Sequence, residues 1–205
     1  MLKRQQPELT RKNLTRAKRM LFDVIELFEQ EKIDYHLEGG TLLGIVRDKE
    51  LLPWDHDVDV SIPFIEVNKL TKGLFSLYMK GYKITIRKSK NDSGSFQRGD
   101  YILFKVKKLV PSVIKWAFPW YHKNYIVLDI FVKKDDSHFT YWQAQGKLLR
   151  VEKSHYSSFE TVEYMSSLLR VPVDYRSYLT KKYGDWSIPV KVWECRSNEG
   201  TIVGN

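Results

Sequence analysis

The chain has 205 residues and a formal net charge of +9, and 42% of its residues are hydrophobic and 14% aromatic. A chain of this length and apolar content is expected to fold around a core, which excludes an intrinsically disordered protein. The positive charge suits a phosphate-rich partner, such as a nucleic acid, a nucleotide-activated substrate or an anionic membrane surface, and is equally compatible with an ordinary basic surface.

Cysteine content and the length of apolar stretches indicate the cellular compartment. Cys195 is the single cysteine, so neither an intramolecular disulfide nor a thiolate metal cage can form, which suits a reducing compartment. Residues 1–20 are polar, and no stretch reaches the roughly 18 consecutive apolar residues of a membrane-spanning helix. We therefore expect a cytoplasmic protein.

The first predicted element is an amphipathic helix over about residues 8–31. Apolar residues there recur at spacings of three and four, with Lys and Arg between them, at Leu14, Ala17, Leu21, Val24, Ile25 and Phe28. A short strand over residues 34–38 follows and breaks at a Gly-Gly pair, where a short helix over residues 41–46 begins. Alternation over residues 57–62 predicts the next strand.

The pattern continues with a helix and several strands. Helical spacing covers residues 65–79, and strand-like alternation covers residues 83–87 and 101–106 on either side of a polar hairpin loop. The most strand-like stretch is 125–132, and a final helix over residues 175–183 ends at a glycine.

This order of elements predicts a mixed α/β (α+β) fold. We expect a single domain over residues 1–205. It would contain the N-terminal helix, a catalytic core over about residues 34–132 and a C-terminal helical part over about residues 140–190.

A glycine pair follows the first predicted strand. Gly39 and Gly40 let the backbone approach a ligand closely, and exposed amide groups there, with the hydroxyl of Thr41, can bind phosphate oxygens. A Gly-Gly pair taken alone is more often a simple turn, so this signal depends on its neighbours.

Carboxylates crowd the next strand. Asp57 and Asp59 lie two residues apart, so period-two geometry places both on one face, where they can share a hard cation such as Mg²⁺. Asp55 adds a third carboxylate. A solvated acidic loop is the alternative, but mutual repulsion among these groups favours a bound cation.

Asp129 lies among apolar neighbours in the strand of residues 125–132. A lone carboxylate there is costly to bury without a cation or hydrogen-bond donors, although a water-facing strand end or a buried arginine partner would also account for it. A glycine turn, an Asp-x-Asp strand and a third aspartate in an apolar strand together form the pattern with which nucleotidyltransferase folds assemble a metal site.

Two neighbouring segments resemble the signature of the LicD family. Residues 38–47, EGGTLLGIVR, and residues 53–60, PWDHDVDV, carry the specific likeness, and residues 171–186 resemble the closing motif of the family. The family includes bacterial phosphocholine transferases and is related to the fukutin-related ribitol-phosphate transferases. One departure is His56, because many members have a third carboxylate at that position.

The resemblance implies a nucleotidyltransferase-like mixed sheet flanked by helices. It also implies metal-dependent transfer of a phospho-alcohol group, such as phosphocholine, ribitol phosphate or glycerol phosphate, from a CDP-linked donor to a glycan hydroxyl, with release of CMP. The glycan would belong to a cell-surface polysaccharide, a lipopolysaccharide or a teichoic acid. Asp57, Asp59 and Asp129 are the catalytic candidates and, with Asp55, the candidate ligands of Mg²⁺ or Mn²⁺. Asp129 could instead be the general base on the acceptor hydroxyl.

Further residues are candidates for holding the phosphates and the base of the donor. Arg47 offers a two-pronged contact to phosphate, with a salt bridge to Asp48 or Glu50 as the alternative. Trp54 could stack on cytosine or anchor local packing. Lys105 could bind phosphate or be a solvated strand lysine.

Residues 105–123 combine lysines with Trp116 and Trp120. This composition predicts peripheral contact with the cytoplasmic face of an anionic membrane, and an ordinary packing loop is equally compatible with it.

Two other functions fit the same residues. One is a nucleotidyltransferase that acts on nucleic acid or a small molecule, and the other is a non-catalytic glycan-binding relative. The sequence contains no RNA-binding motif, so we expect no nucleic-acid partner. It also lacks a nucleophile elbow and a His-x-x-x-His pair, which argues against a covalent intermediate and a zinc hydrolase.

Overall fold

The structure is a computed structural model that describes residues 8–110, 126–191 and 200–203. Its elements are α1 (Lys12–Gln30), β1 (His36–Leu37), α2 (Gly39–Asp48), β2 (Asp57–Pro63), η1 (Phe64–Glu66), α3 (Val67–Met79), β3 (Tyr82–Lys88), β4 (Tyr101–Lys108), β5 (Val127–Asp135), β6 (Phe139–Ala144), β7 (Lys147–Glu152), η3 (Lys153–Tyr156), β8 (Phe159–Tyr164), β9 (Ser167–Pro172) and α5 (Tyr175–Tyr183).

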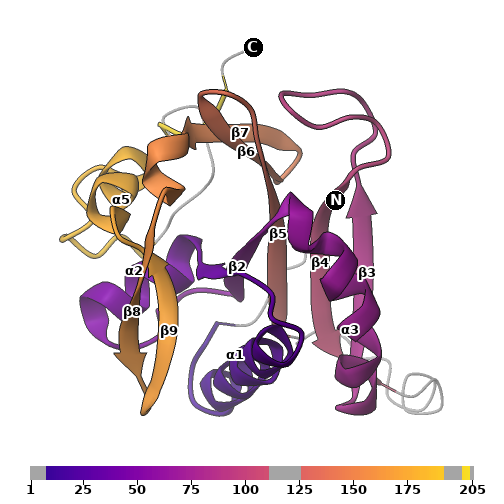
Figure 1. The fold of residues 1–205 in the computed structure, drawn as a ribbon. Coiled ribbons are helices and arrows are strands. Elements are labelled where there is room, and N and C mark those ends of the chain that lie inside the picture. Colours follow the sequence, from indigo (N-terminus) through magenta and orange to yellow (C-terminus); the bar gives the residue numbers. More distant parts are fainter. Residues whose placement is uncertain (1–7, 111–125, 192–199, 204–205) are drawn as a thin grey trace, which may run out of the picture.

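A mixed sheet forms the centre of the molecule, in the order β1-β2-β5-β4-β3 (Figure 1). β2 and β5 run parallel, and the other neighbours in this order are antiparallel. The hairpin β6–β7 extends the sheet from the end of β5, and β8–β9 form a separate hairpin. This arrangement confirms the predicted mixed α/β sheet flanked by helices.

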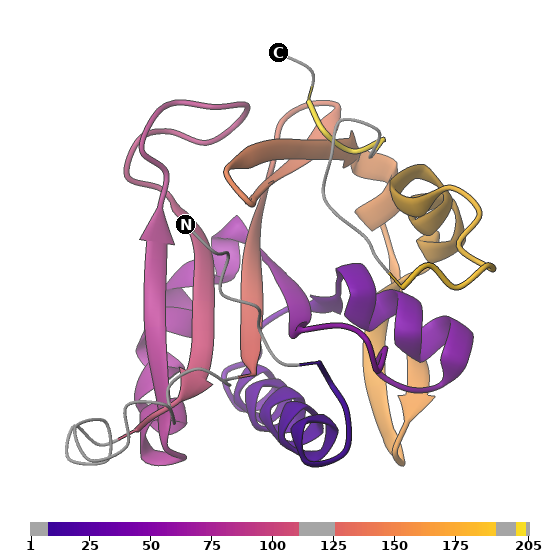
Figure 2. The same cartoon turned by 180° about the vertical axis from the view of Figure 1, so that it is seen from behind.

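The two faces of the central sheet carry different residues. One face packs toward α1 and α3 with fully buried side chains, at Val58, Val60, Phe104, Val106, Leu128 and Ile130. In Figure 1, α3 crosses in front of β3 and β4, and in Figure 2 it lies behind them. Side chains alternate along a strand, so the other face carries the odd-numbered residues, including Asp59, Lys105 and Asp129. We call this second face the functional face.

The C-terminal part is built mainly of strands, so the prediction of a helical region over residues 140–190 is wrong. Two hairpins, β6–β7 and β8–β9, precede α5. Each hairpin turns through two residues with positive φ, which are Gln145 and Gly146 (52° and 78°) and Met165 and Ser166 (51° and 61°). Met and Ser are not the residues usually found in such turns, so composition does not mark the second hairpin.

The other predicted elements lie close to their expected positions. α1 begins at Lys12, four residues later than predicted, because Leu9 leaves the helix axis to pack in the core and its N–H donates to the Asp55 carbonyl (2.9 Å). α5 spans the predicted residues and ends at Gly184, as expected. The single domain expected over residues 1–205 stays a prediction. None of the helices in the described ranges is long and apolar enough to cross a membrane.

Candidate active site

Three aspartates meet on the functional face where β2 and β5 lie side by side. The parallel register places Asp59 directly opposite Asp129, and Asp57 lies two residues along the same strand and on the same face. One carboxylate oxygen from each of Asp57, Asp59 and Asp129 lies within 4.8 Å of the other two. Such a spacing lets three carboxylates reach a single cation, so the structure brings these candidates together.

Burial raises the pKa of all three carboxyl groups, and repulsion between the carboxylates adds to the shift at Asp57 and Asp59. Burial, reinforced by the charges of Asp55 and Asp129, raises the pKa of Asp57 to about 7. Burial and then Asp57 raise the pKa of Asp59 well above its ordinary value. Asp129 also has a raised pKa because it is buried, although Lys105 opposes the shift. A bound cation would offset the repulsion that these shifts report.

One oxygen of the cluster has no partner in the described part of the chain. The Lys105 ammonium donates to Oδ2 of Asp129 at 2.5 Å, whereas Oδ1 of Asp129 is buried without a hydrogen bond. A buried carboxylate oxygen without a donor is costly, and a hard cation is the kind of ligand it accepts. The donor set therefore fits Mg²⁺ or Mn²⁺.

The glycine pair forms the first turn of α2 and lies against the carboxylates. Gly39 has a φ of 54°, and a Cβ there would lie 2.7 Å from Oδ2 of Asp59. At Gly40 a Cβ would lie 2.1 Å from Oδ2 of Asp55. Both glycines therefore allow the N-terminus of the helix, with its partial positive charge, to approach the acidic cluster.

Thr41 helps to position Asp59. Its Oγ1 accepts a hydrogen bond from the backbone N–H of Asp59 at 2.8 Å, and the residue is buried. The oxygen proposed for phosphate is thus engaged in fixing β2 against α2.

The structure also locates the remaining candidates. Arg47 forms the salt bridge to Asp48 that was the alternative, with Nε and Nη2 donating to its carboxylate at 2.7 and 2.8 Å. Its Nη1 donates to the Trp186 carbonyl at 2.9 Å. A phosphate contact would require this pair to open. Trp54 is partly buried and packs against the core, as an anchor would.

Lys105 and Asp55 border the three aspartates. Lys105 is not the solvated lysine considered above, because its side chain is only 15% exposed and pairs with Asp129. Asp55 lies outside the compact group of three, and its charge acts on Asp57. His56 is exposed next to them. Trp116 and Trp120, which carry the membrane prediction, lie outside the described residues.

A buried ion pair near the site was missed by the sequence reasoning. The N-cap residue of α2, Glu38, accepts from Lys133 at 2.6 Å, from Ser61 at 3.2 Å and from the hydroxyl of Tyr178. Lys133 also donates to the Tyr156 hydroxyl and lies over the rings of Tyr156 and Trp142, 3.9 and 4.1 Å from their centroids. Two features of the sequence could have indicated it, a lysine in an apolar strand and an acidic residue before a glycine pair.

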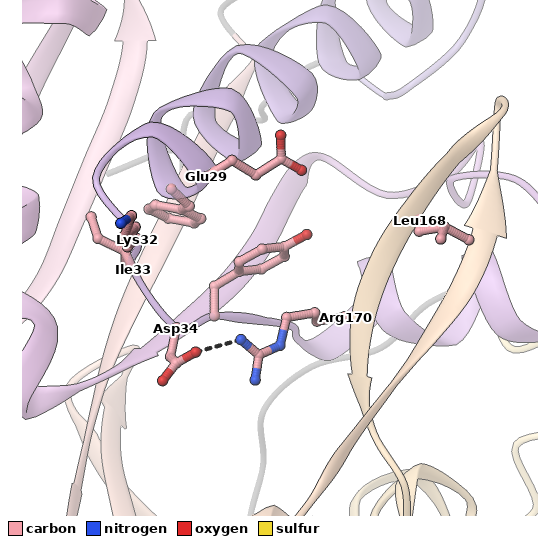
Figure 3. A pocket seen from close by; sticks show the side chains of 8 residues that line it. Glu29, Lys32, Ile33, Asp34, Leu168 and Arg170 are labelled. Carbon is pink, nitrogen blue, oxygen red and sulfur yellow. Dashed lines mark hydrogen bonds and ion pairs between the residues drawn. The ribbon is translucent and has the colours of Figure 1, made fainter.

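A separate pocket of about 280 Å³ lies between the end of α1, the segment before β1 and β9 (Figure 3). Asp34 and Arg170 form an ion pair at its edge, and Tyr35 is buried beside it. None of its lining residues is a candidate from the sequence, so we assign it no role.

The family model of the LicD/FKTN/FKRP nucleotidyltransferase domain matches residues 32–174, well over half of the chain. The chain therefore belongs to this family. The matched residues include β1, α2, β2 and β5, which carry the acidic cluster, whereas α1 and α5 lie outside the match.

Individual relatives match shorter or more distant segments. The lipopolysaccharide cholinephosphotransferase LicD of Haemophilus influenzae is 56% identical over 34 residues, which are 17% of this chain and 13% of that protein. Human ribitol 5-phosphate transferase FKRP is 46% identical over 39 residues, covering 19% of this chain and 8% of that protein. Human ribitol-5-phosphate transferase FKTN is 23% identical over 193 residues, covering 92% of this chain and 37% of that protein. The matches thus cover well under half the length of each of these relatives.

Proposed function

We propose that this chain transfers a phospho-alcohol group, such as phosphocholine or ribitol phosphate, from a CDP-linked donor to a glycan hydroxyl. The names of the relatives, a cholinephosphotransferase and two ribitol-phosphate transferases, support this class of reaction. The observation that carries the proposal is the group of three carboxylates on adjacent strands, with the buried and unpartnered Oδ1 of Asp129 among them.

In this proposal Asp57, Asp59 and Asp129 hold a divalent cation, Mg²⁺ or Mn²⁺. When bound, such a cation neutralises phosphate charge and polarises the phosphorus–oxygen bonds of the donor. Lys105 keeps Oδ2 of Asp129 occupied, which leaves Oδ1 as the free ligand atom and favours the role of ligand over that of general base. Thr41 holds the backbone of Asp59 from the other side, and Gly39 leaves room for its carboxylate.

The chemical step is an exchange at one phosphorus atom. The acceptor hydroxyl oxygen forms a bond to the phosphorus that carries the alcohol, the bond from that phosphorus to the bridging oxygen breaks, and CMP leaves with that oxygen. The hydroxyl proton passes to solvent or to a nearby carboxylate. In this proposal Trp54 stacks on the cytosine of the donor. Arg47 binds a phosphate, which requires its ion pair with Asp48 to open.

The experiment is a panel of CDP-choline, CDP-ribitol, CDP-glycerol and CDP-ethanolamine, read first by thermal shift in Mg²⁺ and then in EDTA. We expect one donor to raise Tm in Mg²⁺ only, because a ligand that binds the folded state stabilises it by mass action. With that donor and a glycan acceptor, CMP release should fall by about a thousandfold or more in Asp59→Asn.

A matched control removes a carboxylate away from the site. Glu160 is exposed on β8, so Glu160→Gln should retain wild-type binding and turnover. Full activity of Asp59→Asn with an unchanged fold would contradict the metal assignment. Extension of RNA with CTP in place of CMP release would favour the nucleic-acid alternative, and donor-independent glycan binding would favour the non-catalytic relative.

A further inference from the structure

Three cations lie on the functional face beside the acidic cluster. The registers of β3, β4 and β5 place Lys105 next to Asp129 and Lys107 next to Val127, and they continue the second row to Lys83. Arg87 lies on the same face of β3, two positions beyond Thr85, the partner of Lys105. We call Lys83, Arg87 and Lys107 the cationic strip.

The strip lacks carboxylate partners, whereas several other lysines in the described ranges have them. Lys18, Lys80 and Lys134 pair with acidic side chains at 2.5–2.6 Å. Across the described ranges, by contrast, the residues of the strip form no ion pair. Burial and the charge of Lys105, with further repulsion from Arg87 and Lys83, lower the pKa of Lys107. Like charges that gather on one face without acidic partners favour the binding of an anion between them.

The charge of the neighbouring site indicates which anion. Three ionised carboxylates, Lys105 and a divalent cation would together carry no net charge. The two negative charges of a nucleoside-diphosphate donor would then have no counter-charge at the metal site itself. Strands are about 4.8 Å apart, so Lys107 and Lys83 lie one and two strands from Asp129, within reach of a diphosphate bound at the cluster.

We propose that the cationic strip on β3 and β4 binds the diphosphate of the donor. This inference rests on the proposed function and extends the donor site across the sheet from β2 to β3. It assigns a phosphate-binding role to Lys83, Arg87 and Lys107. These residues lie on β3 and β4, outside the elements that carry the glycine pair and the three aspartates.

The test measures binding of inorganic pyrophosphate and of CDP-choline in Mg²⁺ by calorimetry. We expect Lys107→Gln to weaken both by roughly tenfold, because a charge-assisted hydrogen bond is lost. The triple variant Lys83→Gln, Arg87→Gln, Lys107→Gln should bind both ligands more weakly still, with a smaller dependence on salt. Lys108→Gln is the control, since Lys108 lies on the same strand but on the opposite face and is exposed.

The outcomes separate this inference from the proposed function. Wild-type affinity for both ligands in the triple variant would show that the cationic strip does not bind the diphosphate. In that case, Mg²⁺-dependent binding of CDP-choline that is lost in Asp59→Asn would still support the proposed function. Strip-dependent pyrophosphate binding without binding of any CDP-alcohol would support the strip and contradict the donor class. An unchanged donor affinity with a raised KM for the acceptor would overturn the assignment of the strip to the donor.

Discussion

At the scale of single residues, the glycine pair matters because it lets the backbone of α2 lie close to aspartate side chains. Gly39 and Gly40 are required because α2 begins against the carboxylates of Asp59 and Asp55, so that a methyl group would overlap them. The sequence suggested that the backbone at these glycines approaches a ligand. In the structure Gly39 approaches Asp59, which would hold the cation, and Gly40 approaches the neighbouring Asp55.

Replacement of Gly39 by alanine tests this role. Gly39→Ala should weaken Mn²⁺ binding by about tenfold or more, because the new Cβ would displace Asp59 from its position. Gly146→Ala is the matched control, since Gly146 also has a positive φ (78°) but has no atom within 4 Å of a Cβ. Gly146→Ala should lose about 1–2 kcal/mol of stability from backbone strain, and Gly39→Ala should lose more because its Cβ also overlaps Asp59. Equal Mn²⁺ affinity in the two variants would argue against the close-approach account.

At the scale of elements, one buried ion pair joins the parts of the fold. Glu38 caps α2, Lys133 belongs to β5, and Tyr178 belongs to α5, which lies outside the family match. Burial pushes the pKa of Glu38 upward, but Lys133 and Lys182 outweigh it, so that the pKa lies below its ordinary value. The pair therefore holds the start of α2, and with it the glycine turn, against the sheet.

Removal of one partner should be costly. Lys133→Met should lower the free energy of unfolding by about 3–5 kcal/mol, because Glu38 would keep a buried charge without its counter-ion. The double variant Glu38→Gln with Lys133→Met should recover part of that loss. Urea unfolding measures both. A loss below about 1 kcal/mol in the single variant would show that the pair is not a stabilising contact.

The elements that the sequence predicted are those with strong local periodicity. α1 and β5 have apolar residues at a clear helical or strand spacing, and both were found near their expected bounds. The hairpins β6–β7 and β8–β9 were missed because their short strands are only partly buried. The turn at Met165 and Ser166 also lacks the Gly, Asn or Asp that is usual at positive φ.

At the scale of the whole molecule, the sheet separates two environments. One face is an apolar layer under α1 and α3, and the functional face carries acidic, basic and aromatic side chains in turn. Asp57 and Asp59 could be singled out from the sequence because their spacing is local, and Asp129 because it lies in an apolar strand. The pairing of Lys105 with Asp129 and of Glu38 with Lys133 depends on the strand order, which no local pattern specifies.

A buried histidine makes stability depend on pH. Burial, with the charge of Lys133, lowers the pKa of His36 to about 3, so the folded state leaves it neutral where the unfolded chain takes up a proton. Its contribution is present above pH 6.5 and is lost progressively as the pH falls toward 3. The effect should reach up to about 1.4 kcal/mol per pH unit.

The measurement compares wild type with His36→Gln by urea unfolding between pH 7 and 5. The aspartates with raised pKa act in the opposite sense, since they contribute stability that is lost as the pH rises, so the readout is the difference in slope between the two proteins. The variant should lose less stability in acid than wild type. Parallel curves would show that His36 does not titrate as a buried neutral group.

The central claim is that Asp57, Asp59 and Asp129 share one divalent cation. The most direct measurement is anomalous diffraction from crystals grown with Mn²⁺. The account predicts a single peak between the three side chains, about 2 Å from an oxygen of each and including Oδ1 of Asp129. An empty site at millimolar Mn²⁺, or a peak bound by other residues, would contradict it.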